Sequence, residues 1–319
     1  MQYKIFGPTG KKVFNVGLGT YGHGEAYGGI TKEESLEILH TAAEYITEDV
    51  HLLIDTAPRY GNGEVEIWIG EFLKNYKKNN ILVATKGGRH IEPRRVNEKD
   101  FSPKFLQADL EGSLKRLGQD NVFLYQLHNP SLDIITDGSV FTFLEEMRRQ
   151  GKIQWYGVSI DTAEEGLAVI DVCRKRRYKG LASLQLIYNI LQKHIIDELQ
   201  RQTNNIDLAI IAREPLLRGF LTDLYDEKVN ISKLPPAPKK VIDLYGKDKL
   251  FAHVKTVRKF LNEQDITMPQ LALQFVLAHP LITTVIPGIN KKGYIALDFS
   301  LDNNNLSLEQ AEQLKKIDD

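Results

Sequence analysis

Short apolar runs alternate with longer amphipathic stretches from one end of the 319-residue chain to the other. Nearly continuous apolar runs indicate parallel strands buried on both faces, and helical spacing of apolar residues predicts helices between them. The predicted strands are Asn15–Leu18, His51–Ile54, Ile81–Ala84, Val122–Leu127, Ile153–Val158, Ala182–Leu186, Leu208–Ala212 and Thr283–Ile286. The predicted helices are 31–46, 64–77, 103–117, 139–150, 162–176, 193–203 and, in two parts, 249–278.

Start signals strengthen several of these helices. Thr31 and Glu34 have the spacing of a capping box, and Ser102 precedes Pro103 as an N-cap precedes a first-turn proline. A further capping box, Ser307 with Gln310, predicts a last helix that runs almost to the end of the chain.

This order of elements predicts an α/β fold, a single (β/α)8 TIM barrel that takes up residues 1–319 as one domain. Segments Tyr3–Phe6 and Lys12–Phe14 predict an N-terminal β-hairpin, and the last helix is an addition at the C-terminus. Residues 222–248, which include the proline-rich stretch 234–238, read as one long irregular segment. Connections of that length are typical of lids and binding loops.

Composition narrows the class of protein. The chain is 42% hydrophobic and 26% charged with a net charge of −1, as in an ordinary globular enzyme, and offers no field for nucleic acid or a membrane surface. The lone Cys173 allows no disulfide framework and no cysteine-based metal site. No apolar run approaches the roughly 18 residues of a membrane span, and no signal peptide is seen. We therefore expect a cytoplasmic protein.

One glycine motif invites a different fold. Gly17, Gly19 and Gly22 have the GxGxxG spacing of a Rossmann dinucleotide-binding turn. That motif needs a helix opening at the third glycine, with the pyrophosphate at its N-terminus. Residues 23–29 are too rich in glycine for a helix, and the next helix start is Thr31, so we reject the Rossmann interpretation.

Four polar side chains at strand ends suggest a reaction. In a TIM barrel the reacting groups lie at the C-terminal ends of the strands, where Asp55, Lys86 and His128 fall, with Tyr60 close behind. An ammonium beside a phenol favours the phenolate, a carboxylate can hold the lysine, and an imidazole can orient a carbonyl oxygen. This set suits carbonyl reduction with Tyr60 as proton donor. Because no side chain supplies a hydride, a nicotinamide cofactor is implied.

These residues resemble the aldo-keto reductase superfamily over essentially the whole chain. The matching segments are "IDTAPRYG" (54–61), "ATKGG" (84–88), "LHNP" (127–130), "VGLGTYG" (16–22), "IAREPLLRGFL" (211–221) and "TVIPGINKK" (284–292). The resemblance implies NAD(P)H-dependent, reversible reduction of an aldehyde or ketone, with Asp55, Tyr60, Lys86 and His128 as the catalytic residues. It leaves one alternative on the same fold, an NADP-binding regulatory subunit with little activity.

The resemblance also implies a cofactor site. Gly19, Thr20 and Tyr21 would line its floor, Ser159 and Gln185 would hold the carboxamide, and segments 213–221 and 288–298 would contact the phosphates. The cofactor residues are Gly19, Thr20, Tyr21, Asp55, Ser159, Gln185, Arg213, Glu214, Leu216, Arg218, Gly288, Asn290, Lys291, Tyr294 and Asp298. NADP(H) is favoured, with NAD(H) as the alternative; Lys291 or Lys292 would pair with a 2′-phosphate.

The chain departs from the family pattern at several of these positions. Ile160 stands where an asparagine often follows the fifth-strand serine, and Arg213 where an aromatic often stacks on the nicotinamide. Near the C-terminus, Tyr294, Leu297 and Asp298 replace the usual arginine or glutamine and glutamate–asparagine pair.

We expect the substrate to be a small carbonyl compound or alcohol. The residues expected to bind it are Tyr21, Tyr27, Tyr60, Arg89, His128 and Asn129. Basic loop residues, Arg89, His90, Arg94 and Arg95, favour a polar or anionic carbonyl compound such as a sugar derivative. A metal-dependent barrel hydrolase would need ligands at several strand ends, and the histidines are scattered, so no metal is expected. The natural substrate, the favoured direction and the oligomeric state stay open.

Overall fold

The predicted strands form a single ring around the centre of the molecule. The computed structural model describes residues 2–24, 28–47, 49–92, 95, 98–202, 206–261, 266–299, 301 and 306–318. An eight-stranded sheet runs in chain order from β3 to β10, and every neighbouring pair is parallel. The strands are β3 (Leu18–Gly19), β4 (Leu52–Asp55), β5 (Ile81–Gly87), β6 (Val122–His128), β7 (Ile153–Ser159), β8 (Leu181–Ile187), β9 (Ala209–Arg213) and β10 (Ile282–Ile286). All eight predicted strands are confirmed.

The first and last strands close the ring into a barrel. Val16 bridges Val285 and Gly19 bridges Gly288, both in parallel. The predicted first strand therefore shifts from Asn15–Leu18 to Leu18–Gly19, because its first residues meet β10 through isolated bridges. A Cβ on Gly19 would lie 2.8 Å from the carbonyl oxygen of Ile286, and one on Gly17 would lie 2.8 Å from that of Leu53. Two glycines of the GxGxxG spacing thus permit strand packing, and the third lies in a 3-10 turn, Tyr21–His23.

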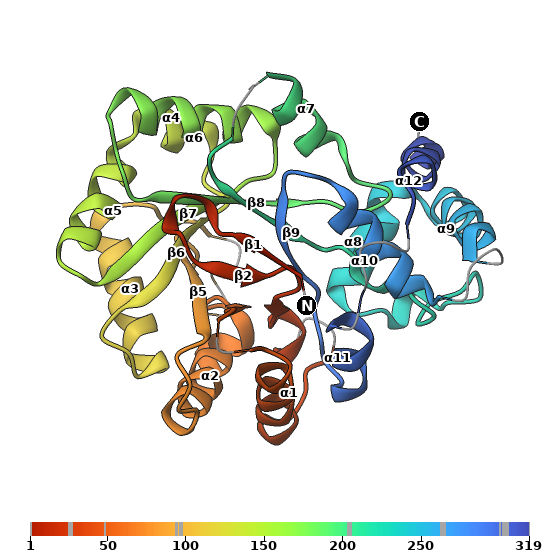
Figure 1. Ribbon diagram of the computed structural model, residues 1–319, viewed down its shortest axis with the longest axis horizontal. Helices are drawn as coiled ribbons and strands as arrows, with labels where there is room; N and C mark the ends of the chain where they lie inside the picture. Colours follow the sequence, from red (N-terminus) through yellow and green to blue (C-terminus); the bar gives the residue numbers. More distant parts are fainter. Residues whose placement is uncertain are drawn as a thin grey trace.

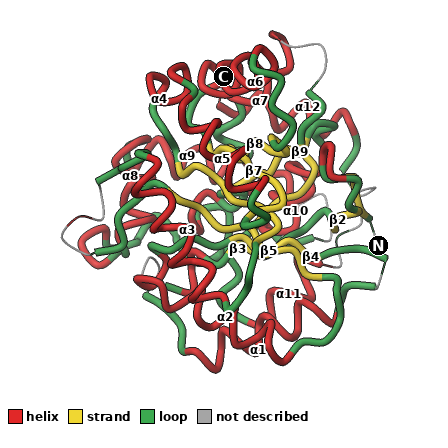
Figure 2. Tube along the Cα trace, turned by 90° about the vertical axis from the view of Figure 1, so that its left-hand side faces the viewer, coloured by secondary structure: helices red, strands yellow, loops and turns green. Residues whose placement is uncertain are grey.

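Helices surround the strands on all sides, as Figures 1 and 2 show. They are α1 (Lys32–Glu44), α2 (Glu64–Asn75), α3 (Pro103–Leu117), α4 (Leu132–Asp137), α5 (Ser139–Arg149), α6 (Ala163–Lys175), α7 (His194–Gln202), α8 (Pro236–Tyr245), α9 (Lys247–Leu261), α10 (Met268–Ala278), α11 (Lys292–Phe299) and α12 (Leu308–Lys315). The capping boxes at Thr31 and Ser307 and the N-cap at Ser102 form as predicted.

Three helices lie outside the predicted set: α4, α8 and α11. The prediction of an irregular 222–248 segment is wrong in part, because α8 and a 3-10 turn at Ile231–Lys233 lie within it. Helix α8 begins at Pro236, and proline is tolerated in a first turn because the amide hydrogens there have no helical partner.

The N-terminal hairpin forms as predicted and covers one end of the barrel. Strand β1 (Tyr3–Ile5) pairs antiparallel with β2 (Lys12–Phe14), and Figure 1 shows the pair, in red, lying across the ring of strands. Phe6 of the hairpin is fully buried against Phe123, with ring centroids 5.5 Å apart. The hairpin therefore closes the end of the barrel at which the strands begin, and the other end stays available for chemistry.

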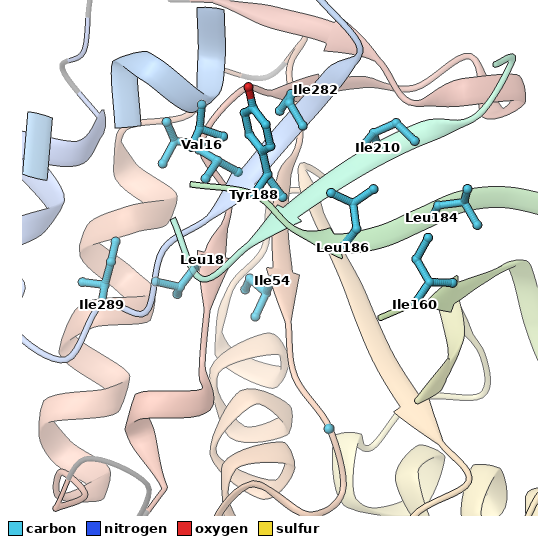
Figure 3. Close-up of a cluster of buried hydrophobic side chains, with 14 of the residues drawn as sticks. Val16, Leu18, Ile54, Ile160, Leu184, Leu186, Tyr188, Ile210, Ile282 and Ile289 are labelled. Atoms are coloured by element: carbon cyan, nitrogen blue, oxygen red, sulfur yellow. The ribbon is translucent and has the colours of Figure 1, made fainter. Parts of the chain in front are cut away.

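Two apolar layers hold the barrel, and the two-residue period of each strand assigns side chains to one or the other. The outer layer, part of which Figure 3 shows, packs residues such as Ile54, Leu184 and Leu186 under the helices. The inner layer includes Leu53 of β4, Ala84 of β5 and Ile211 of β9. Two residues further along those same strands come Asp55, Lys86 and Arg213. Alternation therefore sends these three polar side chains inward at the open end. In the described part of the chain, no helix is long and apolar enough to span a membrane.

Candidate active site

Asp55, Tyr60, Lys86 and His128 converge at the open end of the barrel. The Nζ atom of Lys86 lies 2.5 Å from Oδ1 of Asp55 and 3.3 Å from the hydroxyl oxygen of Tyr60. The ring of His128 meets that of Tyr60 edge-on at a centroid distance of 6.5 Å. One ammonium therefore links a carboxylate to a phenol, with an imidazole beside the phenol.

Two amide side chains hold the far oxygen of Asp55. Nε2 of Gln185 donates to Oδ2 at 2.7 Å, and Nε2 of Gln126 donates to the same atom at 3.1 Å. The backbone oxygen of Asp55 accepts from the Thr20 hydroxyl at 2.9 Å. Sequence analysis missed the role of Gln126. The signal that could have revealed it is a polar amide side chain within the largely apolar strand β6.

The surroundings of the site set the protonation of each group. Burial alone would lower the pKa of Lys86, but Asp55 and Tyr60 together outweigh it and the pKa is raised. Burial raises the pKa of Tyr60, against the opposing effect of the Lys86 ammonium. Burial, together with Lys86 and Arg89, holds the pKa of His128 well below its ordinary value. At neutral pH the site therefore contains an ammonium, a neutral phenol and a neutral imidazole.

The loop that carries Tyr60 has an uncommon backbone. Gly61, Asn62 and Gly63 have φ values of 56°, 52° and 94°, all in the left-handed region. Glycine adopts that region without a steric penalty, and asparagine tolerates it better than most residues do. The three residues turn the chain sharply from Tyr60 into α2, which leaves the phenol on the barrel side of the turn.

A pocket of about 360 Å³, here called the catalytic pocket, opens above these groups. Its lining includes Asp55, Tyr60 and His128, whereas Lys86 is buried beneath it. The predicted cofactor and substrate residues that line it are Gly19, Tyr21, Asp55, Tyr60, Arg89, His128, Asn129, Ser159, Gln185, Arg213, Glu214, Arg218 and Gly288. Arg59, Asp161, Lys240 and Ile286 also line it and were not predicted.

A second pocket of about 390 Å³, here called the outer pocket, continues the first. The two share Glu214, Arg218 and Gly288. Of the predicted cofactor residues, the outer pocket also contains Leu216, Asn290, Tyr294 and Asp298, and part of the 222–248 segment, Thr222 to Leu224, forms one wall. The structure therefore gathers most of the predicted residues along one groove.

A few predicted residues lie elsewhere. Thr20 is fully buried under Asp55, and Lys291 lines neither pocket. Tyr27 and Arg94 lie outside the described residues. Of the other basic loop residues, Arg95 bonds His90 and Glu98 at the surface.

An ion-pair network forms the wall between the two pockets. Arg218 binds both carboxylate oxygens of Glu214 at 2.7 Å. Arg213 donates to Asp161 at 2.7 Å and to Glu214 at 3.1 Å. Glu214 and Arg218 have φ values of 57° and 52°, so the strained backbone lies at the pocket, where such strain is often found.

Two buried donors in the catalytic pocket have no partner within the described residues. They are Nδ2 of Asn129 and Nε of Arg213. The hydroxyl of Ser159 donates to Oδ1 of Asn129 at 3.4 Å. Ile160, which stands where the family often has an asparagine, is fully buried in the outer apolar layer. An unpaired buried donor costs free energy unless a ligand satisfies it, so the pocket fits a ligand rich in acceptors.

Comparison with known proteins assigns the chain to a family. The model of the Aldo/keto reductase family matches residues 15–319. The chain belongs to this family. The uncharacterized oxidoreductase YqkF of Bacillus subtilis is 26% identical over 91% of this chain and 88% of its own length. The NADH-specific methylglyoxal reductase of Escherichia coli is 24% identical over 98% of this chain and 96% of its own length.

A solved structure supports the fold of this aldo-keto reductase. An aldo-keto reductase from Bacillus halodurans in its holo form superimposes with a TM-score of 0.76 at 24% identity, over 99% of this chain and 96% of that chain. The family is one of oxidoreductases that reduce carbonyl groups with nicotinamide cofactors. Within the described residues, no group of three or more histidine, cysteine or acidic side chains could hold a metal ion.

Proposed function

We propose that this aldo-keto reductase reduces an aldehyde or ketone to an alcohol, reversibly, with Tyr60 as the proton donor. The observation that carries the proposal is the placement of Lys86 Nζ within reach of both Asp55 and the Tyr60 hydroxyl, below a pocket. The hydride for the carbonyl carbon would come from a nicotinamide dinucleotide held in the groove. The side chains position the carbonyl and deliver the proton to its oxygen.

Each residue has one task in this proposal. Neutral His128 donates a hydrogen bond to the carbonyl oxygen and turns it toward Tyr60. Tyr60 gives its proton to that oxygen, and the Lys86 ammonium stabilises the phenolate that forms. Asp55 keeps Lys86 charged and in place, since its carboxylate raises the pKa of that ammonium.

The groove suits a nicotinamide dinucleotide. Ser159, Gln185 and the unpaired Nδ2 of Asn129 would hold the carboxamide, and Asn129 would make up for the asparagine that Ile160 replaces. Arg213 and Arg218 would face the phosphates. The preference predicted from sequence is NADPH over NADH.

Two guanidinium groups favour an anionic carbonyl substrate. Arg59 and Arg89 both line the catalytic pocket, and the charge of Arg59 adds to burial in lowering the pKa of Arg89. Arg89 is anchored through Nε to the backbone oxygen of His128 at 3.1 Å. A carboxylate or phosphate on the substrate would relieve the repulsion between the two cations.

The test is reductase activity followed at 340 nm with Tyr60→Phe and a panel of aldehydes and ketones, each neutral compound paired with a carboxylate-bearing one of the same length. We expect kcat/KM of the variant to fall by at least about 100-fold, the usual contribution of a general acid, with cofactor affinity little changed. Tyr3→Phe, on the hairpin at the other end of the barrel, is the matched control. Full activity in Tyr60→Phe would refute the proposed role. Tight cofactor binding with no turnover of any substrate would favour the regulatory-subunit alternative.

A further inference from the structure

Asp298 is a buried carboxylate that no group of the described chain satisfies. It lies on α11, is 3% exposed and lines the outer pocket. Within the described residues it has neither a hydrogen bond nor an ion pair. Burial raises its pKa to about 7, so the group is largely ionised at pH 8. A carboxylate in such a place is expected to bind a donor on a ligand, because leaving it bare is costly.

Cations that could receive a phosphate are scarce in the same pocket. Its described lining carries one cation, Arg218, whose guanidinium already binds both oxygens of Glu214. The lining also includes Asp223, which pairs with Arg258 at 3.0 Å. Of the three carboxylates in this lining, Glu214 and Asp223 are paired with guanidinium groups, and Asp298 is not.

The lysines that sequence analysis assigned to a 2′-phosphate do not line this pocket. Lys292 pairs with Glu37 at 2.8 Å on the surface, and the Nζ atom of Lys291 lies 5.9 Å from the centre of the Tyr294 ring. The part of the lining that comes from residues 288–298 therefore includes Asn290, Tyr294 and Asp298 and no cation.

NADH and NADPH differ by one group, a hydroxyl or a phosphate at the 2′ position of the adenosine ribose. A phosphomonoester carries a charge of roughly −1.5 to −2 at neutral pH, and a carboxylate beside it would repel it. In Rossmann-type sites a carboxylate that accepts from the 2′-hydroxyl selects NAD, whereas an arginine accommodates NADP. The same electrostatics apply in any dinucleotide site.

We propose that the outer pocket selects NADH over NADPH and that Asp298 is the residue that sets this selection. The inference rests on the proposed function, which requires the nicotinamide in the catalytic pocket beside Tyr60. The outer pocket continues the groove past Glu214, Arg218 and Gly288, so the adenosine end enters it. This reverses the preference for NADPH expected from the family resemblance.

Titration calorimetry of the full chain at pH 8, without a carbonyl substrate, tests the selection. We expect NADH to bind at least about tenfold more tightly than NADPH, a difference of about 1.4 kcal/mol. In Asp298→Asn the ratio should narrow about fivefold or more, mainly through tighter NADPH binding. Adenosine 2′,5′-bisphosphate and 5′-AMP serve as probes of the adenosine end, and 5′-AMP should bind more tightly than the bisphosphate.

The matched control is Asp171→Asn, which removes one carboxylate from the exposed face of α6, away from both pockets. Its ratio of NADH to NADPH affinity should equal that of the wild type. Wild-type affinity for NADPH equal to or above that for NADH, with turnover still lost in Tyr60→Phe, would overturn the selection and leave the proposed function intact. An unchanged ratio in Asp298→Asn would overturn the role of Asp298. Failure of both cofactors to bind would refute the inference together with the proposed function.

Discussion

Asp55 is buried, yet both of its carboxylate oxygens accept hydrogen bonds. Lys86 occupies one oxygen, and the amides of Gln126 and Gln185 share the other. Because three donors from three strands hold the carboxylate, it has one orientation. The fixed carboxylate in turn holds the ammonium of Lys86 in one position. Gln126 bonds Asp55 but does not line the catalytic pocket, so in the proposed reaction it is a positioning residue.

Gln126→Leu should lower kcat by about tenfold and leave the dissociation constant of the cofactor nearly unchanged. The physical reason is that Oδ2 of Asp55 loses a donor, so the carboxylate can turn away from Lys86 and the ammonium is no longer held beside Tyr60. Steady-state kinetics together with cofactor titration would separate the two effects. Gln154→Leu, at an exposed position of β7, serves as the control. Equal losses of kcat and cofactor affinity would indicate general damage to the barrel and contradict a positioning role.

At the residue scale, the sequence predicts the side chains whose positions follow from the alternation of residues along a strand. Asp55, Lys86 and His128 stand within two residues of the ends of predicted apolar strands, so the barrel hypothesis alone brought them together. The partnership of Gln126 with Asp55 could not be predicted, because it depends on the register between β4 and β6, which do not pair with each other. The unpaired amide of Asn129 and the unpaired carboxylate of Asp298 also needed coordinates.

At the element scale, a buried polar cluster joins α2 and α3 to β5. Glu66 of α2 is fully buried; it accepts from the Thr85 hydroxyl at 2.6 Å and from Nε of Arg116 at 2.7 Å. Arg116 also donates to Ser113 at 3.2 Å. These bonds fix the two helices behind the strand that carries Lys86.

Glu66→Gln should lower the free energy of unfolding by roughly 2–4 kcal/mol. Removing one charge of a buried pair leaves the other uncompensated, and the loss is somewhat below that of a fully buried pair because Arg116 is 20% exposed. Urea denaturation followed by circular dichroism measures the change. Asp171→Asn, which breaks the exposed pair with Lys175, should cost at most about 0.5 kcal/mol. Similar values for the two variants would contradict the structural role given to the cluster.

Elements with strong local signals were predictable, and those without were not. Short, mostly apolar runs predicted all eight strands, and N-capping residues predicted where α1, α3 and α12 begin. The missed helix α4 has only six residues. Helix α11 has Gly293 in its first turn and no capping residue, so its sequence carries little helical signal and its packing against α1 and α10 must supply the stability.

At the scale of the whole molecule, stability should depend on pH through buried carboxyl groups. Asp109 of α3 accepts a hydrogen bond from the backbone of Gly88 at 3.1 Å, and burial raises its pKa to about 7. The pKa of the folded state lies above the ordinary 3.8, so between these values the folded chain binds more protons than the unfolded one. The free energy of unfolding contributed by this group therefore falls as pH rises from about 4 through about 7, and stays low above that. His23, whose pKa burial lowers to about 4, acts in the opposite direction below pH ~6.5.

Comparing Asp109→Asn with the wild type cancels the contribution of the histidines. Asparagine can still accept from Gly88 and carries no charge, so the stability of the variant relative to the wild type should be greater at pH 8 than at pH 5, by roughly 1–3 kcal/mol. Urea titrations at pH 5, 6.5 and 8 measure this difference, with Asp171→Asn as a control that should show none. A difference that does not change with pH would mean that Asp109 keeps an ordinary pKa in the folded chain.

That residues 1–319 form a single domain stays a prediction, and one cooperative transition in the same titrations would support it.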